Sequence, residues 1–316
     1  MVPLPTVVVA DPIDATALAR LRTGACTVVD ASVDPKELSR HLPTAWALIV
    51  RSRTKVDRAL LTAAPNLKII ARAGVGVDNV DMAAAGERGI SVVNAPAGAT
   101  ASVAELSVAL YLLLVRGLLP KILSTRAGKW ERGTSGHELA GLTVGFVGYG
   151  RIAREVARRL GPFGATTVAF DPFVKSPVDA TKIVSFDDLL ARADIVSVHA
   201  ALTPENHHLL DARAFDWMKP GAFLVNVARG ALVDEAALLT ALNAGKVGGA
   251  ALDVLEEEPP MQRTLVEHPR VIVTPHLGAS TPEAQLRAGS DVVDEVLRAL
   301  KGELLRALVA PPGGAR

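Results

Sequence analysis

Short runs of apolar and β-branched residues recur along the whole chain, and segments with helical spacing separate them. Strands that are apolar on both faces and alternate with helices are typical of parallel sheets covered by helices on each side. The sequence therefore predicts an α/β fold built from doubly wound parallel sheets. The expected strands are Thr6–Ala10, Ala47–Val50, Leu67–Ala71, Ser91–Asn94, Thr143–Val147, Thr167–Phe170, Ile195–His199, Phe223–Val227, Gly249–Leu252 and Val271–Thr274.

The expected strands fall into two sets, one before the segment 95–98 and one starting at Thr143. A chain of 316 residues has room for about two domains. The helix expected at Pro282–Leu300 has no strand after it, so it can return to pack on the first set. We therefore predict a smaller domain from residues 1–97 and 283–316, interrupted by a second domain at 98–282. Further helices are expected at Asp14–Thr23, Ala101–Val115, Arg151–Leu160, Phe186–Arg192 and Asp234–Ala244.

Composition excludes several classes of function. The formal net charge is +1, which argues against nucleic acid as the main partner. The longest apolar stretch, Val108–Val115, is too short to span a bilayer. The N-terminus lacks the basic start and long apolar core of a signal peptide. Cys26 is the one cysteine, which fits a reducing compartment, so we expect a cytoplasmic protein without a membrane partner. No metal site is predicted.

A glycine-rich turn follows the expected strand Thr143–Val147 and opens a helix. It has the pattern Gly148-x-Gly150-x-x-Ala153. In this context the first glycine permits a tight turn, the second lets the backbone approach a pyrophosphate, and the alanine allows close packing of helix on strand. The helix N-terminus offers N–H groups and a positive dipole end to phosphates. The turn predicts a dinucleotide site.

Asp171 ends the next expected strand, where a carboxylate can accept hydrogen bonds from the hydroxyls of an adenine ribose. It would repel a 2′-phosphate, which favours NAD over NADP. Lys175 lies close enough in sequence to keep NADP open as an alternative.

Reactive side chains follow three later strands. Arg229, Asp253 and His276 all lie at or just beyond predicted strand ends, which in a doubly wound sheet point towards the ligand cleft. Histidine suits proton transfer near neutral pH, and arginine can bind a carboxylate through two hydrogen bonds. A carboxylate beside the histidine would fix its tautomer. The residues alone leave open whether Asp253 or Glu258 is that carboxylate. Together they predict hydride transfer at a hydroxyl next to a carboxylate.

With these motifs in this order, the chain resembles the NAD-dependent D-isomer-specific 2-hydroxyacid dehydrogenases almost from end to end. The resemblance is carried by residues 72–81, Ala104-Glu105-Leu106, 128–132, Gly148–Ile152, Ala228-Arg229-Gly230, Ala250–Val254, 257–260 and 275–281. Several long motifs in the correct order make the resemblance specific. It implies a Rossmann NAD-binding domain inserted in a smaller flavodoxin-like substrate domain.

The resemblance also implies roles for individual residues. Arg229 would bind the substrate, His276 would be the acid and base, and Glu258 would pair with it. The loop Ala73-Gly74-Val75-Gly76 would offer N–H groups to the substrate carboxylate. Asp253 would lie near the nicotinamide. The full set expected to contact NAD is Val75, Gly148, Gly150, Arg151, Ile152, Asp171, Ala200, Val227, Ala228, Asp253, Gly278 and Ala279.

Further arginines bear on the choice of 2-hydroxy acid. Arg51 and Arg72 follow expected strands of the first domain, and Arg132 matches a basic position that in this family reaches across a dimer interface. Arginines at these places favour a phosphorylated substrate, D-3-phosphoglycerate, which would be oxidised to 3-phosphohydroxypyruvate as the first step of serine biosynthesis. Ala97 and Ala99 depart from the family pattern, where polar residues are usual.

Two alternatives remain at the level of sequence. One is a reductase of glyoxylate or hydroxypyruvate, or an enzyme of D-lactate type, on the same scaffold. The other is an NAD-sensing corepressor without catalytic activity, which the complete reactive set disfavours. A homodimer is expected, with the helix Ala101–Val115 and the Trp130–Arg132 segment meeting across it.

Overall fold

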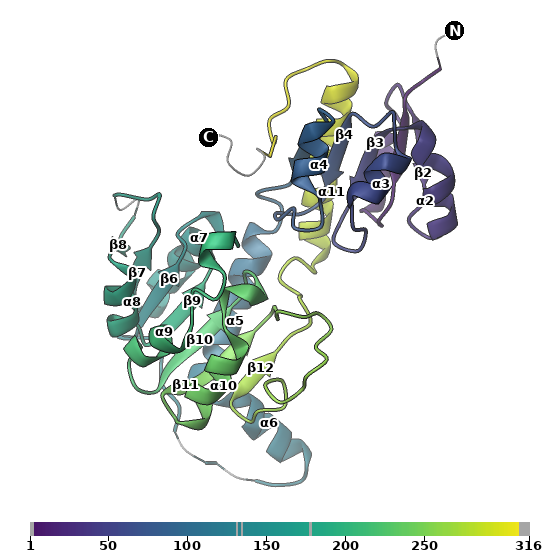
Figure 1. Cartoon of the computed structure of the whole chain (residues 1–316). Helices are drawn as coiled ribbons and strands as arrows, with labels where there is room; N and C mark the ends of the chain where they lie inside the picture. The colour runs from purple at the N-terminus through teal and green to yellow at the C-terminus, as the bar shows by residue number, and fades with distance from the viewer. Residues whose placement is uncertain (1–2, 131, 134, 177–178, 310–316) are drawn as a thin grey trace. The chain divides into compact units, whose positions relative to one another are not determined.

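A computed structural model describes residues 3–130, 132–133, 135–176 and 179–309. The chain divides into two compact units, Met1–Thr100 with Ala279–Arg316, and Ala101–Gly278. Each unit is built on one wholly parallel sheet (Figure 1). The predicted α/β class with two parallel sheets is confirmed.

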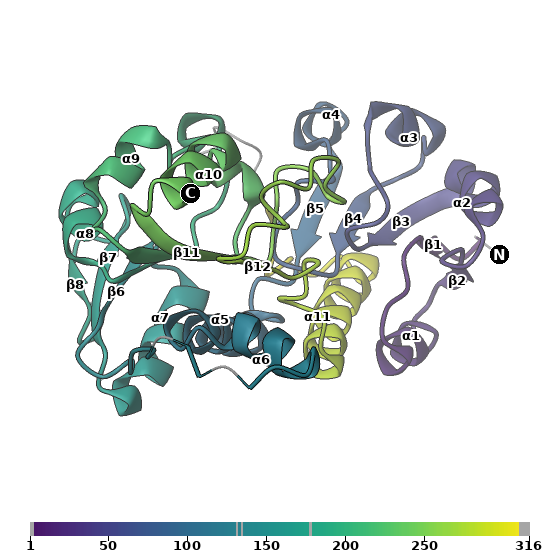
Figure 2. The same ribbon diagram turned by 90° about the horizontal axis from the view of Figure 1, so that it is seen from below.

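The first unit has a five-stranded sheet in the order β2-β1-β3-β4-β5. In Figure 2, α1 and α11 lie on one face of this sheet and α2, α3 and α4 on the other. Each face has its own buried apolar cluster. The elements are β1 (Thr6–Val9), α1 (Ala15–Leu21), β2 (Thr27–Asp30), α2 (Pro35–His41), β3 (Ala45–Val50), α3 (Arg58–Ala63), β4 (Ile69–Arg72), α4 (Met82–Glu87), β5 (Ser91–Asn94) and α11 (Pro282–Leu300).

The second unit has a seven-stranded sheet in the order β12-β11-β10-β9-β6-β7-β8. The order reverses between β9 and β6, which is the switch point where dinucleotides bind in doubly wound sheets. Its strands are β6 (Thr143–Val147), β7 (Thr166–Phe170), β8 (Lys182–Ile183), β9 (Ile195–Val198), β10 (Ala222–Asn226), β11 (Val247–Leu252) and β12 (Val271–Val273). Its helices are α5 (Thr100–Val115), α6 (Leu118–Arg126), α7 (Arg151–Leu160), α8 (Phe186–Arg192), α9 (Ala212–Trp217) and α10 (Glu235–Asn243).

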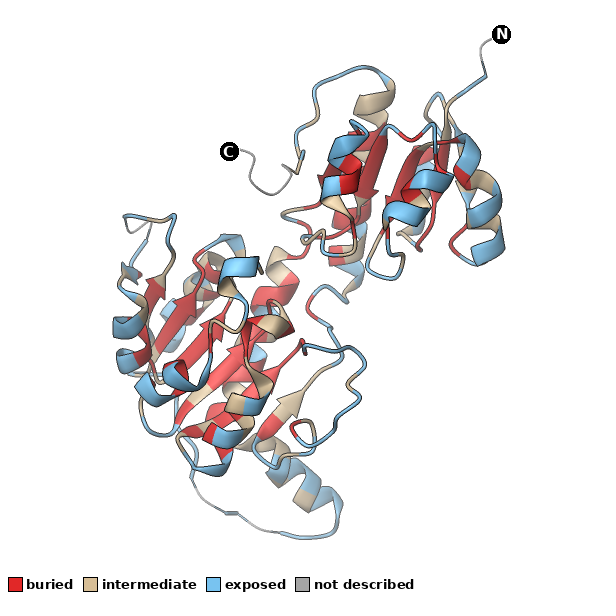
Figure 3. Ribbon diagram, in the orientation of Figure 1, coloured by how far each residue is buried: buried red, intermediate tan, exposed pale blue. Residues whose placement is uncertain are grey.

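Helices cover both faces of this second sheet, with α9 and α10 on one side and α5 and α7 on the other (Figure 2). The central strands are buried along their length, as Figure 3 shows. In the part of the chain that the structure describes, no single helix is long and apolar enough to cross a membrane.

Several short elements were not predicted. They are β2, β8, α2, α3, α4, α6 and α9. Helices of six or seven residues are marginal in isolation and gain their stability from packing. A usable signal was present, because Asp34, Asp57 and Asp81 each accept a backbone N–H at the start of α2, α3 or α4.

Candidate active site

The glycine-rich turn between β6 and α7 has the geometry expected of a phosphate-binding turn. Gly148 has φ +88°, and a Cβ there would lie 2.7 Å from the Cα of Ala200. Gly150 begins α7 without a side-chain cap, and a Cβ at this position would meet nothing within 4 Å. Ala153 is fully buried. The first turn of α7 therefore offers backbone N–H groups beside open space, which suits an anion.

Asp171 lies immediately after β7 and is fixed by the backbone around it. Its Oδ2 accepts a hydrogen bond from the N–H of Tyr149 at 2.8 Å, and its Oδ1 accepts one from the N–H of Phe173 at 2.8 Å. Each carboxylate oxygen has a further lone pair, so both can also accept from ribose hydroxyls. The residues of this turn thus fit a dinucleotide. Arg151 is exposed and Ile152 half-buried in the first turn of α7.

The predicted histidine and glutamate are brought together. His276 Nδ1 lies 2.8 Å from Glu258 Oε2, and both side chains remain partly open to solvent. The hydrogen bond to Glu258 outweighs burial and raises the pKa of His276. Burial opposes ionisation of Glu258, yet the contact with His276 holds the pKa of that carboxyl below its usual value. The pair therefore favours the imidazolium–carboxylate form, with Nε2 as the ring nitrogen that can exchange a proton.

Asp253 organises the segment that carries His276. It is 1% exposed and follows β11. Its Oδ1 accepts from Thr274 Oγ1 (2.5 Å) and the N–H of Leu277 (2.7 Å), and its Oδ2 accepts from the N–H of Gly278 (2.8 Å). The N–H of His276 donates to the Asp253 carbonyl, and His276 has φ +53°. Because the backbone occupies this carboxylate, Glu258 and not Asp253 pairs with His276.

Arg229 follows β10 in a turn held by a buried amide. Asn226 Nδ2 donates to the Arg229 carbonyl at 2.8 Å, and its Oδ1 accepts from the N–H of Ala228 at 3.0 Å. The Arg229 guanidinium donates through Nη1 to the Ala228 carbonyl and lies close enough to Glu258 to contribute to its lowered pKa. Val227 is 9% exposed, as is Ala228. Asn226 was not among the residues predicted from the sequence to have a role in the site.

A tight contact fixes the turn that carries Glu258. A Cβ at Gly230 would lie 1.9 Å from the carbonyl carbon of Leu255, so only glycine fits there. The N–H of Leu255 donates to Glu258 Oε1 at 3.1 Å, and the N–H of Glu256 donates to Glu235 Oε1 at 2.8 Å. Glu258 is therefore held by its own turn on one oxygen and by His276 on the other.

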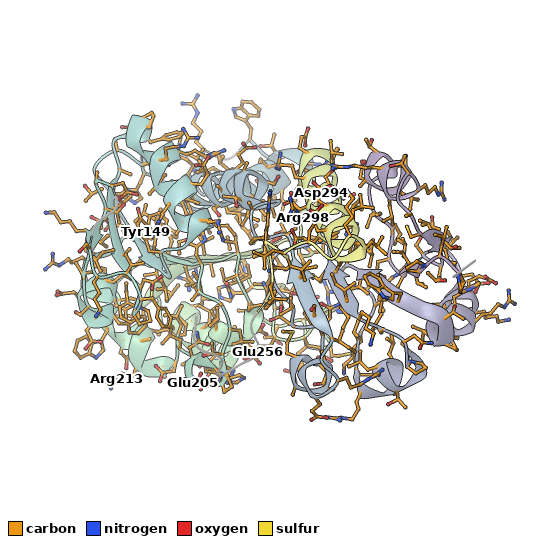
Figure 4. The ribbon with its side chains drawn as sticks, turned by 90° about the horizontal axis from the view of Figure 1, so that it is seen from above. Tyr149, Glu205, Arg213, Glu256, Asp294 and Arg298 are labelled. Carbon is orange, nitrogen blue, oxygen red and sulfur yellow. The ribbon has the colours of Figure 1, made fainter. Side chains whose placement is uncertain are left out.

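The first unit holds most of the predicted substrate residues. Arg51, Ala73, Gly74, Ala99 and Ala279 line one cavity of about 20 Å³ in that unit. Such a volume holds about one water molecule. A second, larger cavity of about 420 Å³ is lined by residues that include Ala97 and, on α11, Asp294 and Arg298 (Figure 4). Only one of the two unusual alanines thus lines the cavity that contains Arg51.

The loop after β4 brings Arg72 over a glycine. A Cβ at Gly74 would lie 1.8 Å from Arg72 Nη1, so this position needs glycine while the guanidinium stays there. Val75 is 37% exposed, and its carbonyl accepts a hydrogen bond from Asn94 Nδ2. Gly76 is half-buried. In the second unit, Arg132 is exposed in the segment after α6, and Glu131 beside it lies outside the described residues.

Comparison with known proteins gives the family. Residues 108–278 match the model of the NAD-binding domain of D-isomer specific 2-hydroxyacid dehydrogenases. The chain belongs to this family. It is 48% identical over 98% of its length to the D-3-phosphoglycerate dehydrogenase of Mycobacterium leprae, and it spans 60% of that relative's length. The family and the NAD-binding domain predicted from the sequence are confirmed.

Solved structures of similar proteins cover nearly the whole chain. The TT0316 protein of Thermus thermophilus superposes with a TM-score of 0.87 at 36% identity, covering 96% of this chain and 100% of that one. A glyoxylate reductase from Paecilomyes thermophila superposes with a TM-score of 0.89 at 32% identity, covering 97% and 98%. The chain spans about 60% of the length of the curated relatives that it matches.

Proposed function

We propose that this chain is an NAD-dependent dehydrogenase that oxidises a D-2-hydroxy acid, with D-3-phosphoglycerate as substrate and 3-phosphohydroxypyruvate as product, the first step of serine biosynthesis. The observation that carries the proposal is the His276–Glu258 pair, 2.8 Å apart, in the unit that also holds the glycine turn. The arrangement suits alcohol oxidation because it joins a proton acceptor to a dinucleotide site.

Each side chain of the site has a proposed role, which its position in the structure supports. NAD, when bound, supplies the hydride acceptor. His276 takes the proton of the substrate hydroxyl through Nε2, while Glu258 fixes the ring through Nδ1 and stabilises the imidazolium that forms. Arg229 binds the carboxylate and polarises the oxygen that becomes a carbonyl. Gly148, Gly150 and the start of α7 hold the pyrophosphate, with Arg151 and Ile152 in that first turn.

The remaining cofactor assignments are also part of the proposal. Asp171 would bind the adenine ribose. Asp253 would reach the cofactor only indirectly, through the segment that it organises. The other residues that we assign to NAD contacts are Val75, Ala200, Val227, Ala228, Gly278 and Ala279.

The phosphate of the substrate is assigned to cations of the first unit. Arg51 lines the small cavity together with Ala73 and Gly74, and Arg72 lies over Gly74. The backbone of Arg51 is held in place, because its N–H donates to Asp11 Oδ2 at 2.6 Å. A bidentate guanidinium is well suited to a phosphate. Val75 and Gly76 would complete the loop, and Arg132 would act from a partner subunit.

The test is NADH formation over a panel of D-2-hydroxy acids, with NADP as a control. The proposal expects turnover of D-3-phosphoglycerate to exceed that of unphosphorylated acids. It expects His276→Ala to lose about 10²- to 10⁴-fold in kcat while NADH binding is retained. Charge-neutral variants of Arg51 and Arg72 should raise KM for phosphoglycerate more than for D-lactate. Unchanged phosphoglycerate turnover in those variants would refute the phosphate assignment.

A reductase of glyoxylate or hydroxypyruvate is the second candidate, and the similarity to a solved glyoxylate reductase favours it. It predicts the opposite order of rates in the same panel. Ala99 in place of a polar residue beside Arg51 also leaves fewer donors for a phosphorylated substrate.

We further infer a cytoplasmic homodimer. Large apolar side chains are exposed on α6 and just after it, with Ile122 46%, Leu123 55% and Trp130 83% exposed. A second copy of the chain would cover them. Light scattering that gives the mass of a monomer at assay concentration would refute the dimer.

A further inference from the structure

Tyr149, the residue between the two glycines of the turn, has a side chain that the proposed chemistry does not use. It is fully buried, and Figure 4 labels it in the second unit. Its ring packs against Phe146, with centroids 5.9 Å apart, and the Arg154 guanidinium lies 5.7 Å from its centroid. The ring is therefore fixed by an aromatic neighbour and a cation.

The hydroxyl of Tyr149 reaches the segment that joins β7 to β8. It lies 2.8 and 2.7 Å from the two oxygens of Asp179 and 2.6 Å from Thr181 Oγ1. Thr181 is fully buried, and its Oγ1 lies 2.8 Å from that of Thr167 on β7. A phenol has one proton and an ionised carboxylate only accepts, so Tyr149 donates to Asp179 and the threonine hydroxyl completes the network.

The backbone and the side chain of Tyr149 each bind a carboxylate that follows β7. The backbone N–H of Tyr149 donates to Asp171 Oδ2 at the start of the β7–β8 segment, and the phenol holds Asp179 and Thr181 at its end. The carbonyl of Tyr149 accepts from Arg154 Nε at 3.1 Å, which ties the same residue to α7. The glycine turn is thus connected through Tyr149 to Asp171, Asp179 and Thr181.

We propose that Tyr149 is a positioning residue for NAD. Its hydroxyl, anchored on Asp179 and Thr181, fixes the turn residue whose N–H holds Asp171 towards the adenine ribose, and Asp179 adds a second negative charge against a 2′-phosphate. This deepens the proposed function and rests on its assignment of Asp171 to the ribose. Burial opposes ionisation of Asp179, but the hydrogen bonds from Tyr149 and Thr181 hold the pKa of that carboxyl below its usual value. Asp179 therefore stays charged at neutral pH.

The chain offers a matched control, because it has two tyrosines and both are fully buried. Tyr111 on α5 places its hydroxyl 2.6 Å from Ser197 Oγ, in the same unit. Tyr111→Phe and Tyr149→Phe each delete one buried hydroxyl. We expect a general loss of stability in both variants and a weaker affinity for the cofactor only in Tyr149→Phe.

The experiment measures Kd for NADH and NADPH by calorimetry, together with Tm, kcat and KM for NAD. For Tyr149→Phe we expect the Kd for NADH to rise about three- to tenfold, the effect of losing roughly one ordinary hydrogen bond. KM for NAD should rise with it while kcat is retained. Tyr111→Phe should lower Tm without changing either Kd. Asp179→Asn, which keeps an acceptor but loses the charge, should tighten NADPH binding more than NADH binding.

Two results would overturn the proposal. One is a Kd for NADH in Tyr149→Phe within twofold of wild type. The other is an equal rise in Kd for Tyr149→Phe and Tyr111→Phe, which would show a general effect of destabilisation. If Asp179→Asn does not lower the Kd for NADPH, the charge of Asp179 does not act against a 2′-phosphate and that part of the proposal is wrong. These titrations contain no hydroxy acid, so their outcome is independent of whether phosphoglycerate is the substrate.

Discussion

Gly230→Ala tests whether the catalytic pair depends on the close packing of two turns. The added Cβ would lie 1.9 Å from the carbonyl carbon of Leu255, 2.0 Å from its oxygen and 2.3 Å from the nitrogen of Glu256. All three are backbone atoms, so no side-chain rotation relieves the clash. Ordinary contact begins at 3.4 Å, and the 255–256 backbone has to retreat by about 1.5 Å.

That retreat acts directly on Glu258, because the N–H of Leu255 donates to Glu258 Oε1. A misplacement of about 1 Å in a catalytic group can cost roughly 100-fold in rate. We therefore expect kcat to fall by about 100-fold or more, with a loss of about 1–3 kcal/mol in the free energy of unfolding from overpacking. Steady-state NADH formation and urea denaturation measure the two effects.

Gly161→Ala is the matched control for this variant. Gly161 lies in the same unit at the end of α7, has φ −51°, and a Cβ there meets nothing within 4 Å. We expect its kcat to be unchanged and its stability equal or slightly higher. If Gly230→Ala keeps more than a third of wild-type kcat, the turn does not position Glu258 and the reasoning fails.

Three further variants test the electrostatics of the second unit. The oxidation rate should increase with pH as His276 loses its proton, because the neutral ring is the base. Since Glu258 raises the pKa of His276, Glu258→Gln should shift this increase to lower pH. An unshifted rate profile would contradict this. The stability that this pair adds is lost above the ordinary histidine pKa of 6.5, as pH rises through the raised pKa of His276. It is also lost below the ordinary glutamate pKa of 4.5, as pH falls through the lowered pKa of Glu258. The difference between wild type and Glu258→Gln in urea should thus peak between those values and be modest, since both side chains are over a third exposed. His199→Phe should lower the free energy of unfolding by about 1 kcal/mol at pH 7, since it removes the contact with Ser197. It should also reduce the loss of stability in acid, because burial lowers the pKa of His199 to about 3 and only the unfolded chain gains this proton between pH 6.5 and 3. An unchanged acid transition would refute this account. Asp253→Asn should cost roughly 1–3 kcal/mol and lower kcat, because an amide nitrogen cannot accept the backbone N–H groups now bound; activity equal to wild type would show that this carboxylate does not organise His276.

The glycine turn and the main strands could be predicted because their signals are local. The segments 143–147 and 151–160 have the observed bounds of β6 and α7, since an apolar run, two glycines and a helical pattern follow one another directly. The short helices α2, α3 and α4 were missed because six or seven residues give too few apolar positions for a clear period. Their stability comes from tertiary packing, which no single segment reveals.

The residues alone did not decide which of two carboxylates pairs with the histidine. From residues alone, it stayed open whether Asp253 or Glu258 pairs with His276. The family resemblance favoured Glu258, and the tertiary structure supplies the physical reason. Three donors from the 274–278 segment occupy the oxygens of Asp253, whereas Glu258 keeps Oε2 for His276.

The sequence by itself determined the family, the α/β class, the dinucleotide turn and the identity of the reactive residues, because each depends on the order of residues along the chain. Only the tertiary structure decided which groups meet across elements. The phenol of Tyr149 donates to Asp179, Gly230 packs against the backbone of Leu255, and Asp253 accepts from the loop that carries His276. Such contacts depend on how strand ends converge at one edge of a sheet. That convergence is set by packing among residues far apart in sequence.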